Sequence, residues 1–489
     1  MPRSKPSLAA IVLAAGKGTR MKSSRAKVLH EAGGRPLAWY PVKRALEAGA
    51  DPVAVVVGHQ AEAVEAAIAA ALPGEAIRFA LQRDQRGTAH AVLAAKGALR
   101  GCKGPILILS GDTPLLEAGT LRRVLQARAR ARASLAFATM TVETPLGYGR
   151  VLRDAAGRPE RVVEEKDATA AQRAVREVNA GLYCADAEFL WKALSRVGKK
   201  NAQREFYLPD LVEIAARHGS VAAVPVDPAE ASGVNDREEL ARAAKVLLRR
   251  RAVALMKAGV TLEDPDRFDC DEGVEIGVDT VIEPGVRLLG RTHVGARCRI
   301  GAGAVLRDMV LADGVTLLPY TVANESTILA RAIVGPFSRL RPGSEIGEEA
   351  HIGNFVETKK SHIGRGAKAN HLAYLGDSFV GARSNVGAGT ITCNYDGEKK
   401  HQTRIGEGVF VGSDSILVAP IEIGDGAYIA AGSVLTDPVP AGALALGRAR
   451  QVTKEGWVAK RRAEKQLEKE QAAPAPRGKA RTPPVPRAG

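Results

Sequence analysis

A glycine-rich turn followed by cations lies near the start of the sequence. Residues 13–21 are Leu-Ala-Ala-Gly-Lys-Gly-Thr-Arg-Met, and Lys27 follows soon after them. Met21 stands where the third glycine of a dinucleotide-binding GxGxxG motif would lie, and the turn lacks the GxxxxGK pattern of a Walker loop. Backbone N–H groups of such a turn can still cradle phosphate oxygens while Arg20 and Lys27 neutralise their charge. These residues predict an anion site, with an ordinary strand-to-helix turn as the alternative.

A second polar cluster lies in the C-terminal half, within a region that is otherwise aliphatic. Its members include a histidine, tyrosines, asparagines and cations that a purely structural coil does not need. They are Arg341, Lys359, Lys360, His371, Tyr374, Asn385, Asn394, Tyr395 and Lys400. Each lysine could equally be a solvated rim residue, and a lone histidine is more often structural. We interpret the cluster as a candidate functional site.

The elements that must position the first site alternate between apolar strands and amphipathic helices. Strands are predicted at 8–14, 52–57 and 105–109, and each runs into Gly, His or Asp. Helices are predicted at 61–72 and 120–131. This alternation predicts a parallel or mostly parallel α/β sheet, whose ligands bind at the carboxyl ends of the strands.

After a long basic helix predicted at 236–258, the sequence acquires a period of six. Aliphatic residues recur at every sixth position in three registers. These are Ile276, Ile282, Leu288, Val294, Ile300 and Leu306; Val322, Ile328, Val334, Leu340, Ile346 and Ile352; and Ile405, Val411, Leu417, Ile423, Ile429 and Leu435. A coil of short strands with three faces per turn has this period, and 276–435 then predicts about nine turns. A glycine-rich β-sandwich would not keep the register. The loop 396–403 interrupts it.

The composition fits a globular protein with anionic ligands. The 489 residues are 45% hydrophobic and 25% charged, which excludes a chain disordered throughout and a membrane protein. The net charge is +16. Residues 451–489 contribute +6 of it, because they hold ten Lys or Arg residues and four Glu residues. No basic patch is interleaved with aromatic residues, so phosphorylated small molecules are favoured over nucleic acid. The five cysteines are scattered without a CxxC pair, which argues against a disulfide framework or zinc ribbon.

The apolar run at 8–15 follows Arg3 and Lys5 and is similar to a short signal peptide. It leads directly into the glycine-rich turn without a cleavage-like stretch, so we favour a first buried strand. No other stretch approaches 18 apolar residues. We expect a cytoplasmic protein with no membrane partner.

Motifs in both halves resemble those of one known family. Residues 13–21 with Lys27-Val28-Leu29 resemble the signature of sugar-1-phosphate nucleotidyltransferases. Further matches follow in chain order at 81–82, 85–90, 110–114, 147–150, 163–168, 177–181 and 233–235. Together with 371–377, which lie in the hexapeptide region, they make residues 8–457 similar to the bacterial bifunctional N-acetylglucosamine-1-phosphate uridyltransferase/glucosamine-1-phosphate N-acetyltransferases.

The resemblance implies a Mg²⁺-dependent uridyltransferase site in the first half. A sugar-1-phosphate oxygen is already anionic, so its attack on the α-phosphorus of UTP needs positioning and charge neutralisation rather than a general base. The implied metal ligands are Asp112 and Asn235, and a helix N-cap is the alternative for Asp112. The residues implied to bind UTP or the UDP-sugar are Leu13, Ala14, Ala15, Gly16, Arg20, Lys27, Gln82, Gly87, Thr88, Ser110, Asp112, Gly149, Glu164, Asn179 and Asn235.

The resemblance also implies acetyl transfer from acetyl-CoA to glucosamine-1-phosphate in the second half. The substrate amine must lose a proton to attack a thioester, and a histidine can accept it. His371 is implied to be this base, while Cys393 lacks an evident activating base for a nucleophilic role. The other implied residues are Arg341 and Lys359 at the sugar phosphate, Tyr374, Asn385 and Lys400 at the amino sugar, and Asn394, Tyr395, Ser413, Ala431 and Arg448 along acetyl-CoA.

A few positions depart from the family pattern. Arg204 and Phe206 stand where Gly and Tyr are usual, and Glu165 replaces a commoner His. Asn370 replaces a Gly directly before His371. We expect Asn370 to matter most, because its Cβ could tilt His371 and lower its rate.

These predictions combine into four segments. Residues 1–235 form an α/β nucleotidyltransferase domain with a Rossmann-like mixed sheet, and 236–258 a linker helix. Residues 259–453 form an all-β, left-handed parallel β-helix of hexapeptide repeats. Residues 454–489 form a basic tail, which begins as a charged helix-like run after Trp457 and which we expect to be disordered. The left-handed sense of the coil is implied by the resemblance alone, because the general rule for parallel crossovers predicts a right-handed one.

The predicted enzyme is a homotrimer that makes UDP-N-acetylglucosamine and pyrophosphate from UTP and N-acetylglucosamine-1-phosphate, for cell-wall and lipopolysaccharide precursors. The open ends and flat faces of a prism favour such assembly. One alternative is a single-activity nucleotidyltransferase whose hexapeptide domain only assembles or regulates it. A second alternative is a nucleic-acid-binding scaffold driven by the net charge.

Overall fold

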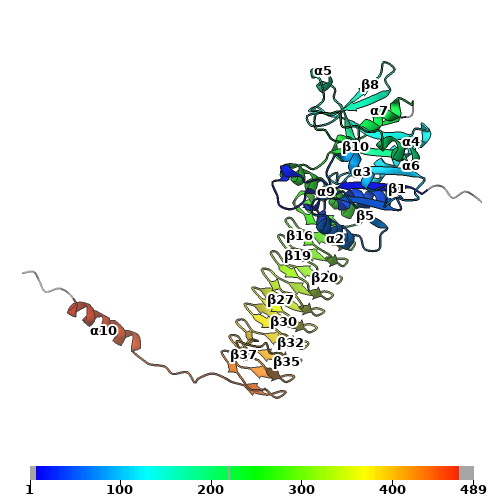
Figure 1. The fold of residues 1–489 in the computed structure, drawn as a ribbon. Helices are drawn as coiled ribbons and strands as arrows, with labels where there is room; N and C mark the ends of the chain where they lie inside the picture. Colours follow the sequence, from blue (N-terminus) through cyan, green and yellow to red (C-terminus); the bar gives the residue numbers. More distant parts are fainter. Residues whose placement is uncertain (1–6, 219–220, 473–489) are drawn as a thin grey trace, which may run out of the picture.

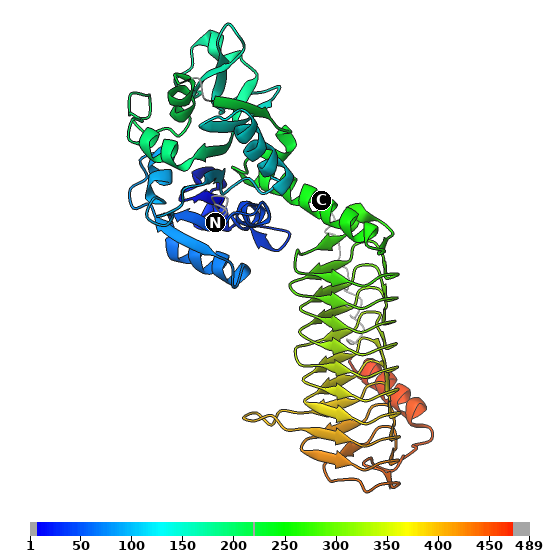
Figure 2. The same cartoon turned by 90° about the vertical axis from the view of Figure 1, so that its right-hand side faces the viewer.

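An α/β domain is joined to a three-sided prism of short strands by one long helix, α9 (Arg237–Lys257) (Figure 1). The computed structural model describes residues 7–218 and 221–472. Seen from the side, the prism extends away from the α/β domain, and α9 lies between the two (Figure 2). The two parts therefore meet at one end of the prism.

A mixed sheet forms the centre of the α/β domain. Its strands are β1 Ala9–Ala14, β4 Val53–Val57, β5 Ile77–Leu81, β6 Pro105–Ser110, β7 Leu135–Thr141, β8 Arg150–Arg153, β9 Pro159–Val163, β10 Glu177–Asp186 and β11 Val221–Pro225. Their order is β11-β7-β10-β6-β1-β4-β5, with the β8–β9 hairpin paired to β10. β1, β4, β5 and β6 are parallel, whereas β10 is antiparallel to β6 and β7. The prediction of a mostly parallel sheet is confirmed.

Helices cover both faces of this sheet. One face packs against α1 Trp39–Glu47, α2 Ala61–Ala71 and α4 Ala118–Arg130, and the other against α3 Thr88–Ala94, α6 Ala187–Leu194 and α7 Asp210–Ala216. Successive strand residues point to opposite faces, so Val12 lies in the first core and Ile11 in the second. The predicted strands and helices agree with these bounds to within two residues.

The linker helix α9 belongs to both cores. Its N-cap is Asp236, whose side chain accepts a hydrogen bond from the backbone N–H of Glu239 at 2.9 Å. Ala243 and Leu247 pack into the core of the α/β domain, while Leu255 packs into the core of the prism. The helix is therefore a packed strut between the two parts.

The C-terminal part coils through three faces. The first face runs from β12 (Thr261–Leu262) to β41 (Leu444–Ala445), the second from β13 (Asp269–Cys270) to β40 (Val434–Leu435), and the third from β14 (Glu275–Ile276) to β38 (Ile421–Ile423). Neighbouring strands in each face are parallel. The inward side chains of the three faces merge into one aliphatic core. Within the described residues each face stacks 9 to 11 strands, which agrees with the predicted number of turns.

The predicted registers identify the inward residues with one error. Val322 is wrong, because it is 38% exposed while its neighbour Ala323 is 2% exposed and takes the inward place. The step from inward Leu306 to inward Leu311 is one residue shorter than a hexad, and this shifts the register. A second short step, from Ala323 to Ile328, shifts the register by one more residue, into that of Ile328 and Val334.

α10 (Trp457–Gln471) is an exposed helix at the helix-like run that begins the tail, which we expected to be disordered. Its sequence consists mostly of Ala, Glu, Lys and Arg, which are strong helix formers. Arg461 and Glu464 form an ion pair at 3.3 Å along it, and the helix stands apart from the prism (Figure 1). The remainder of the predicted tail, 473–489, lies outside the described residues.

The apolar run at the start of the chain forms β1 and is buried, as favoured over a signal peptide. Among the helices in the described ranges, none has both the length and the apolar character needed to cross a bilayer.

Candidate active sites

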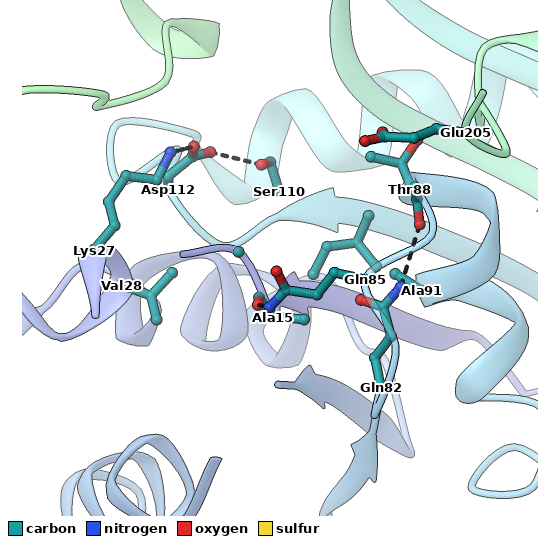
Figure 3. A pocket seen from close by; sticks show the side chains of 13 residues that line it. Ala15, Lys27, Val28, Gln82, Gln85, Thr88, Ala91, Ser110, Asp112 and Glu205 are labelled. Carbon is teal, nitrogen blue, oxygen red and sulfur yellow. Dashed lines mark hydrogen bonds and ion pairs between the residues drawn. The ribbon is translucent and has the colours of Figure 1, made fainter. Parts of the chain in front are cut away.

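The carboxyl ends of the parallel strands border a cavity of about 330 Å³ (Figure 3). Gln82, directly after β5, is 4% exposed and its amide donates to the carbonyl oxygen of Gly87 at 3.3 Å. The Gln85 amide donates to the carbonyl oxygen of Ala15 at 2.6 Å. These bonds hold the loop after β5 against the turn after β1. The cavity is lined by Leu13, Ala15, Gly16, Lys27, Val28, Gln82, Gln85, Gly87, Thr88, Ala91, Ser110, Asp112 and Glu205.

Two oxygen-bearing side chains converge on one cation beside this cavity. The Lys27 ammonium forms an ion pair with Asp112 and donates to Asn235 Oδ1 at 3.3 Å. Arg20 Nη2 donates to the same Asn235 oxygen at 2.7 Å, and Ser110 Oγ to Asp112 Oδ1 at 2.6 Å. A carboxylate and an amide oxygen gathered around a positive charge are a donor set that suits Mg²⁺. The described residues hold no cluster of three or more His, Cys, Asp or Glu side chains that could bind a metal, so substrate and water oxygens would complete the coordination.

The glycine-rich turn packs directly on Lys27. Gly18 has a φ of 63°, and a Cβ there would lie 2.4 Å from Lys27 Cβ, so this position requires glycine both for conformation and for space. Asp112 is not the N-cap of the following helix, because Glu117 occupies that position in α4. The helix N-cap alternative for Asp112 is therefore wrong, and its role as a metal ligand stays a prediction.

A second cavity of about 280 Å³ adjoins the first and shares Ser110 and Asp112 with it. Burial, followed by the nearby carboxylates of Asp167 and Asp210, raises the pKa of Glu164. Asn179 Nδ2 donates to the Tyr183 hydroxyl at 2.6 Å. The lining residues are Arg20, Ser110, Asp112, Thr113, Leu146, Gly147, Tyr148, Gly149, Glu164, Asn179, Ala180, Gly181, Ala231, Gly233, Asn235 and Glu239.

All the residues that the resemblance implied for UTP or the UDP-sugar line one of these two cavities, except Ala14. The Ala14 side chain is buried in the core below β1, so only its backbone can face a ligand. Sequence reasoning missed Gln85, Tyr148 and Glu239. Gln85 and Tyr148 lie inside motifs that the resemblance had singled out, whereas Glu239 comes from the linker helix and had no local signal.

On the prism, His371 lies at the edge between the first and second faces. It ends β30 (Lys368–His371), and its side chain is exposed. Ser413, Ala431 and Arg448 continue along this edge on successive coils. Gly432 N donates to Ser413 O at 2.7 Å, and Arg448 Nη1 donates to Ala431 O at 2.8 Å. The structure thus aligns the presumed base with most of the residues implied for acetyl-CoA.

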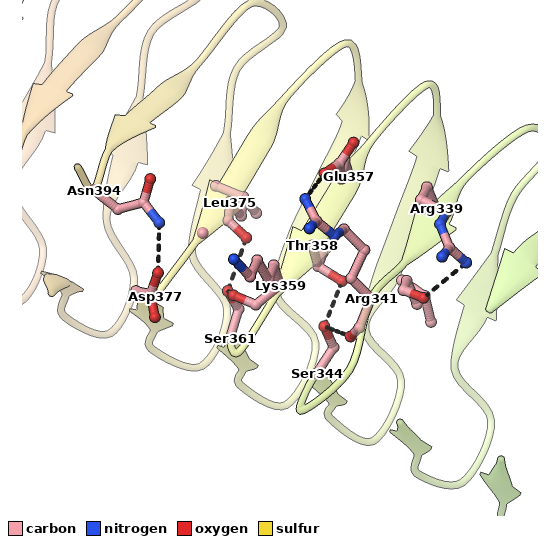
Figure 4. A network of polar contacts seen from close by, with 12 residues as sticks. Arg339, Arg341, Ser344, Glu357, Thr358, Lys359, Ser361, Leu375, Asp377 and Asn394 are labelled. Atoms are coloured by element: carbon pink, nitrogen blue, oxygen red, sulfur yellow. Dashed lines mark hydrogen bonds and ion pairs between the residues drawn. The ribbon is translucent and has the colours of Figure 1, made fainter. Parts of the chain in front are cut away.

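The cations implied for the sugar phosphate lie on a different edge, between the second and third faces (Figure 4). Contact with Lys400, together with burial and the charge of Arg341, lowers the pKa of Lys359. Arg341 is paired with Glu357 at 2.8 Å. Like charges held together in this way attract an anion.

The remaining implied residues are divided between these places. Asn394 and Tyr395 begin the loop between β34 (Ile391–Cys393) and β35 (Thr403–Ile405), which projects from the prism (Figure 2). Tyr374 lies on the second face between the two edges, and Asn385 lies on the first face. One chain therefore does not bring all of them together.

Asn370 fits tightly below the presumed base. Its Oδ1 is buried and has no hydrogen-bond partner among the described residues. Its backbone carbonyl oxygen lies so close to Gly353 that a Cβ on that glycine would be 2.0 Å away. The His371 side chain reaches the surface, and the effect of Asn370 on its tilt and rate stays a prediction.

Comparison with known proteins matches both halves of the chain. A MobA-like NTP transferase domain model matches residues 10–178. A bacterial transferase hexapeptide (six repeats) model, typical of left-handed β-helices, matches residues 402–437.

Full-length relatives carry a single name, "Bifunctional protein GlmU". The protein from Anaeromyxobacter sp. (strain Fw109-5) is 73% identical over 97% of this chain and 98% of its own length. The one from Anaeromyxobacter dehalogenans (strain 2CP-C) is 72% identical over 98% of this chain and 99% of its own length. The one from Trichlorobacter lovleyi is 50% identical over 93% of this chain and 98% of its own length. The chain belongs to the GlmU family of bifunctional enzymes, N-acetylglucosamine-1-phosphate uridyltransferases and glucosamine-1-phosphate acetyltransferases that make UDP-N-acetylglucosamine.

Proposed function

We propose that the two activities reside in separate parts of the molecule. Residues 1–235 carry uridylyl transfer, 236–258 form the linker, 259–453 carry acetyl transfer and 454–489 form a basic extension. The observation that carries this division is the separation of the two polar sites. The paired cavities lie in the α/β domain, whereas His371 and its neighbouring cations lie on the prism.

In uridylyl transfer, an oxygen of N-acetylglucosamine-1-phosphate attacks the α-phosphorus of UTP and pyrophosphate leaves. Arg20 and Lys27 neutralise the phosphates, and the polar loop around Gln82 holds the uracil. Asp112 and Asn235 hold Mg²⁺, which supplies further charge neutralisation when bound. Because the two cavities share Asp112, nucleotide and sugar phosphate meet beside it.

The second cavity takes the acetylated amino sugar. The Glu164 carboxyl and the Asn179 amide provide hydrogen-bonding groups for sugar hydroxyls and for the N-acetyl group. The burial of Glu164 makes an unsatisfied hydrogen bond costly, so a sugar that lacks the matching group is disfavoured.

In acetyl transfer, the amine of glucosamine-1-phosphate attacks the thioester carbonyl of acetyl-CoA. His371 accepts the amine proton, the new C–N bond forms, the C–S bond breaks and the proton passes to the departing coenzyme A thiolate. Arg341 and Lys359 hold the sugar phosphate, with Tyr374, Asn385 and Lys400 around the amino sugar. Acetyl-CoA lies along the His371 edge past Ser413, Ala431 and Arg448, with Asn394 and Tyr395 from the projecting loop.

We further propose that three copies associate with their prisms parallel. His371 and Lys359 lie on different edges of one prism, so an edge of one copy must meet the other edge of the next to complete a site. The His371 edge carries a suitable apolar seam. Tyr320, Phe337 and Phe355 are 55%, 48% and 59% exposed, and their rings stack at 5.2 and 5.6 Å.

Separate half-reactions test this function. Glucosamine-1-phosphate with acetyl-CoA is expected to release free thiol, and N-acetylglucosamine-1-phosphate with UTP and Mg²⁺ to release pyrophosphate. The product supplies cell-wall and lipopolysaccharide precursor synthesis in the cytoplasm. Pyrophosphate release without any thiol release would instead favour a single-activity nucleotidyltransferase with a prism that only assembles it.

A further inference from the structure

An ion pair between a buried arginine and a partly exposed glutamate lies directly behind the loop 146–149 that lines the second cavity. Arg150 opens β8 and is 2% exposed. Its Nη2 lies 2.6 Å from Oε2 of Glu165, which follows β9. Glu165 therefore sits across the hairpin from the loop, and its neighbour Glu164 lines the cavity itself.

Each end of this pair also holds the backbone of the loop. Arg150 Nη1 donates to the carbonyl oxygen of Tyr148. Glu165 Oε2 accepts a hydrogen bond from the N–H of Gly147 at 3.3 Å. Two consecutive residues of the cavity wall are thus bound from behind by one ion pair. Arg173, at the end of the short helix α5 (Ala170–Arg173), lies 3.6 Å from the other Glu165 oxygen and orients that carboxylate.

The loop has little room to move toward the sheet. A Cβ on Gly149 would lie 2.7 Å from Val162 Cγ1 and 3.1 Å from Glu164 Oε1, so even a methyl group does not fit. The carbonyl oxygen of Gly149 accepts a hydrogen bond from the Asn179 backbone N–H at 2.8 Å. Packing therefore limits inward movement, and the ion pair limits outward movement.

The pair is held in its charged form. Hydrogen bonding from Arg150, followed by that from the Gly147 N–H, lowers the pKa of Glu165. A guanidinium as buried as that of Arg150 needs a charged partner, and removal of the partner leaves an uncompensated charge. Loss of the Glu165 charge should therefore release the Arg150 side chain and, with it, the Tyr148 carbonyl.

We propose that Arg150 and Glu165 are positioning residues that hold the loop 146–149 at the distance the amino sugar requires, and so set the affinity for N-acetylglucosamine-1-phosphate. This inference rests on the proposed function of the second cavity. Neither side chain is among the residues that line that cavity, so each acts through the loop. Glu165 is also one of the departures from the family pattern.

The test compares Glu165→Gln with Glu177→Gln. Glu177 begins β10 and forms an equally short ion pair, at 2.6 Å, with Arg153, which lies on β8 like Arg150. The side chains of both glutamates are 24% exposed. Arg153 and Glu177 do not line the cavity. In the full-length protein, Glu165→Gln is expected to raise the KM for N-acetylglucosamine-1-phosphate about tenfold while kcat and the KM for UTP change less than about twofold. Glu177→Gln is expected to leave all three unchanged, and Glu165→Asp, which keeps the charge, to fall between wild type and Glu165→Gln.

Two results would overturn the proposal. One is a Glu165→Gln enzyme with the kinetics of Glu177→Gln. The other is an equal loss of UTP and sugar-phosphate affinity, which would mean that the pair only stabilises the domain. Absence of pyrophosphate release in the wild-type protein would count against the proposed function itself, whereas a working wild type with an unaffected Glu165→Gln counts against this inference alone.

Discussion

The two sugar-phosphate sites that we propose, one in each half of the molecule, are built in opposite ways. In the α/β domain, loops from successive strands converge, so a single chain encloses adjoining cavities, buries Gln82 and partly buries Glu164. On the prism, each coil repeats the one before it, so side chains are laid out along edges and His371 stays exposed. A converging sheet makes a pocket by folding alone, whereas a coil of this kind needs a second surface to close one.

We expect removal of divalent cations to distinguish the two activities most strongly. Removal of divalent cations with EDTA is expected to reduce pyrophosphate release to background, because the crowded phosphates lose their main neutralising charge. Thiol release is expected to remain, since the acetyl transfer that we propose for the prism has no step that uses a metal. The two half-reaction assays, with and without added Mg²⁺, measure this directly. A parallel loss of thiol release would break the proposed contrast.

Removal of the imidazole should affect only the prism. His371→Ala is expected to lower thiol release by about 10²–10⁴-fold, the usual contribution of a general base, with pyrophosphate release unchanged. His362→Ala is the matched control, because His362 lies on the third face, stacked on Phe379 at 4.9 Å. Equal effects of the two substitutions, or loss of both activities from a folded protein, would refute the role of His371.

A charge in the apolar seam tests whether the prism needs a neighbour. Phe337→Glu is expected to shift the sedimentation of the protein toward the monomer and to lower thiol release about tenfold, because the exposed ring loses its apolar partner surface. Pyrophosphate release should persist, since its cavities lie within one chain. Arg297→Glu, on the edge between the third and first faces, is the control. An unchanged trimer with full thiol release would place the interface elsewhere.

The smallest predicted effect concerns the buried carboxyl groups of the α/β domain. Burial, helped by Glu213 and Asp167, raises the pKa of Asp210 from 3.8 to about 6. An acid whose pKa is raised by folding destabilises the native state once it ionises, so stability falls as the pH rises through about 4 to 6.

Asp210→Asn is therefore expected to raise the Tm at pH 8 by about 2–4 °C, equivalent to roughly 1 kcal/mol. Most of the gain should be lost at pH 4, where the Asp210 carboxyl of the native protein is neutral. Calorimetry at the two pH values measures the difference. Asp154→Asn should give no gain, because hydrogen bonds from Arg158 lower the pKa of Asp154. A gain at pH 4 equal to that at pH 8 would rule out the electrostatic explanation.

Some features of the sites could be predicted from the sequence because their signals are local. The residues after β1, β5 and β6 meet in one cavity, since parallel strands end at the same edge of a sheet. Gln85 and Tyr148 lie within motifs that were already singled out. Glu239 carries no such signal, because a side chain of the linker helix reaches the sugar cavity only after that helix packs against the domain.

Other features could not be predicted from the period of six, because the turns of the coil differ in length. Val322 lies six residues before Ile328, yet the step between inward residues is only five there, so Ala323 is the inward residue. The tail was expected to be disordered, yet Trp457–Gln471 form a helix without packing against the prism. Local helix propensity decided the outcome there, and overall charge and composition were a poor guide.

By itself, the order of residues determined the kind of fold in each half. Alternating apolar and amphipathic segments specify a layered sheet, and one aliphatic side chain per six residues specifies a three-faced coil. Only the tertiary structure decided which polar groups act together. It paired Arg150 with Glu165 behind the loop 146–149, and it placed His371 and Lys359 on separate edges of the prism. Periodicity reveals which side chains point inward, but contacts between distant segments depend on how turns and loops bring them together in space.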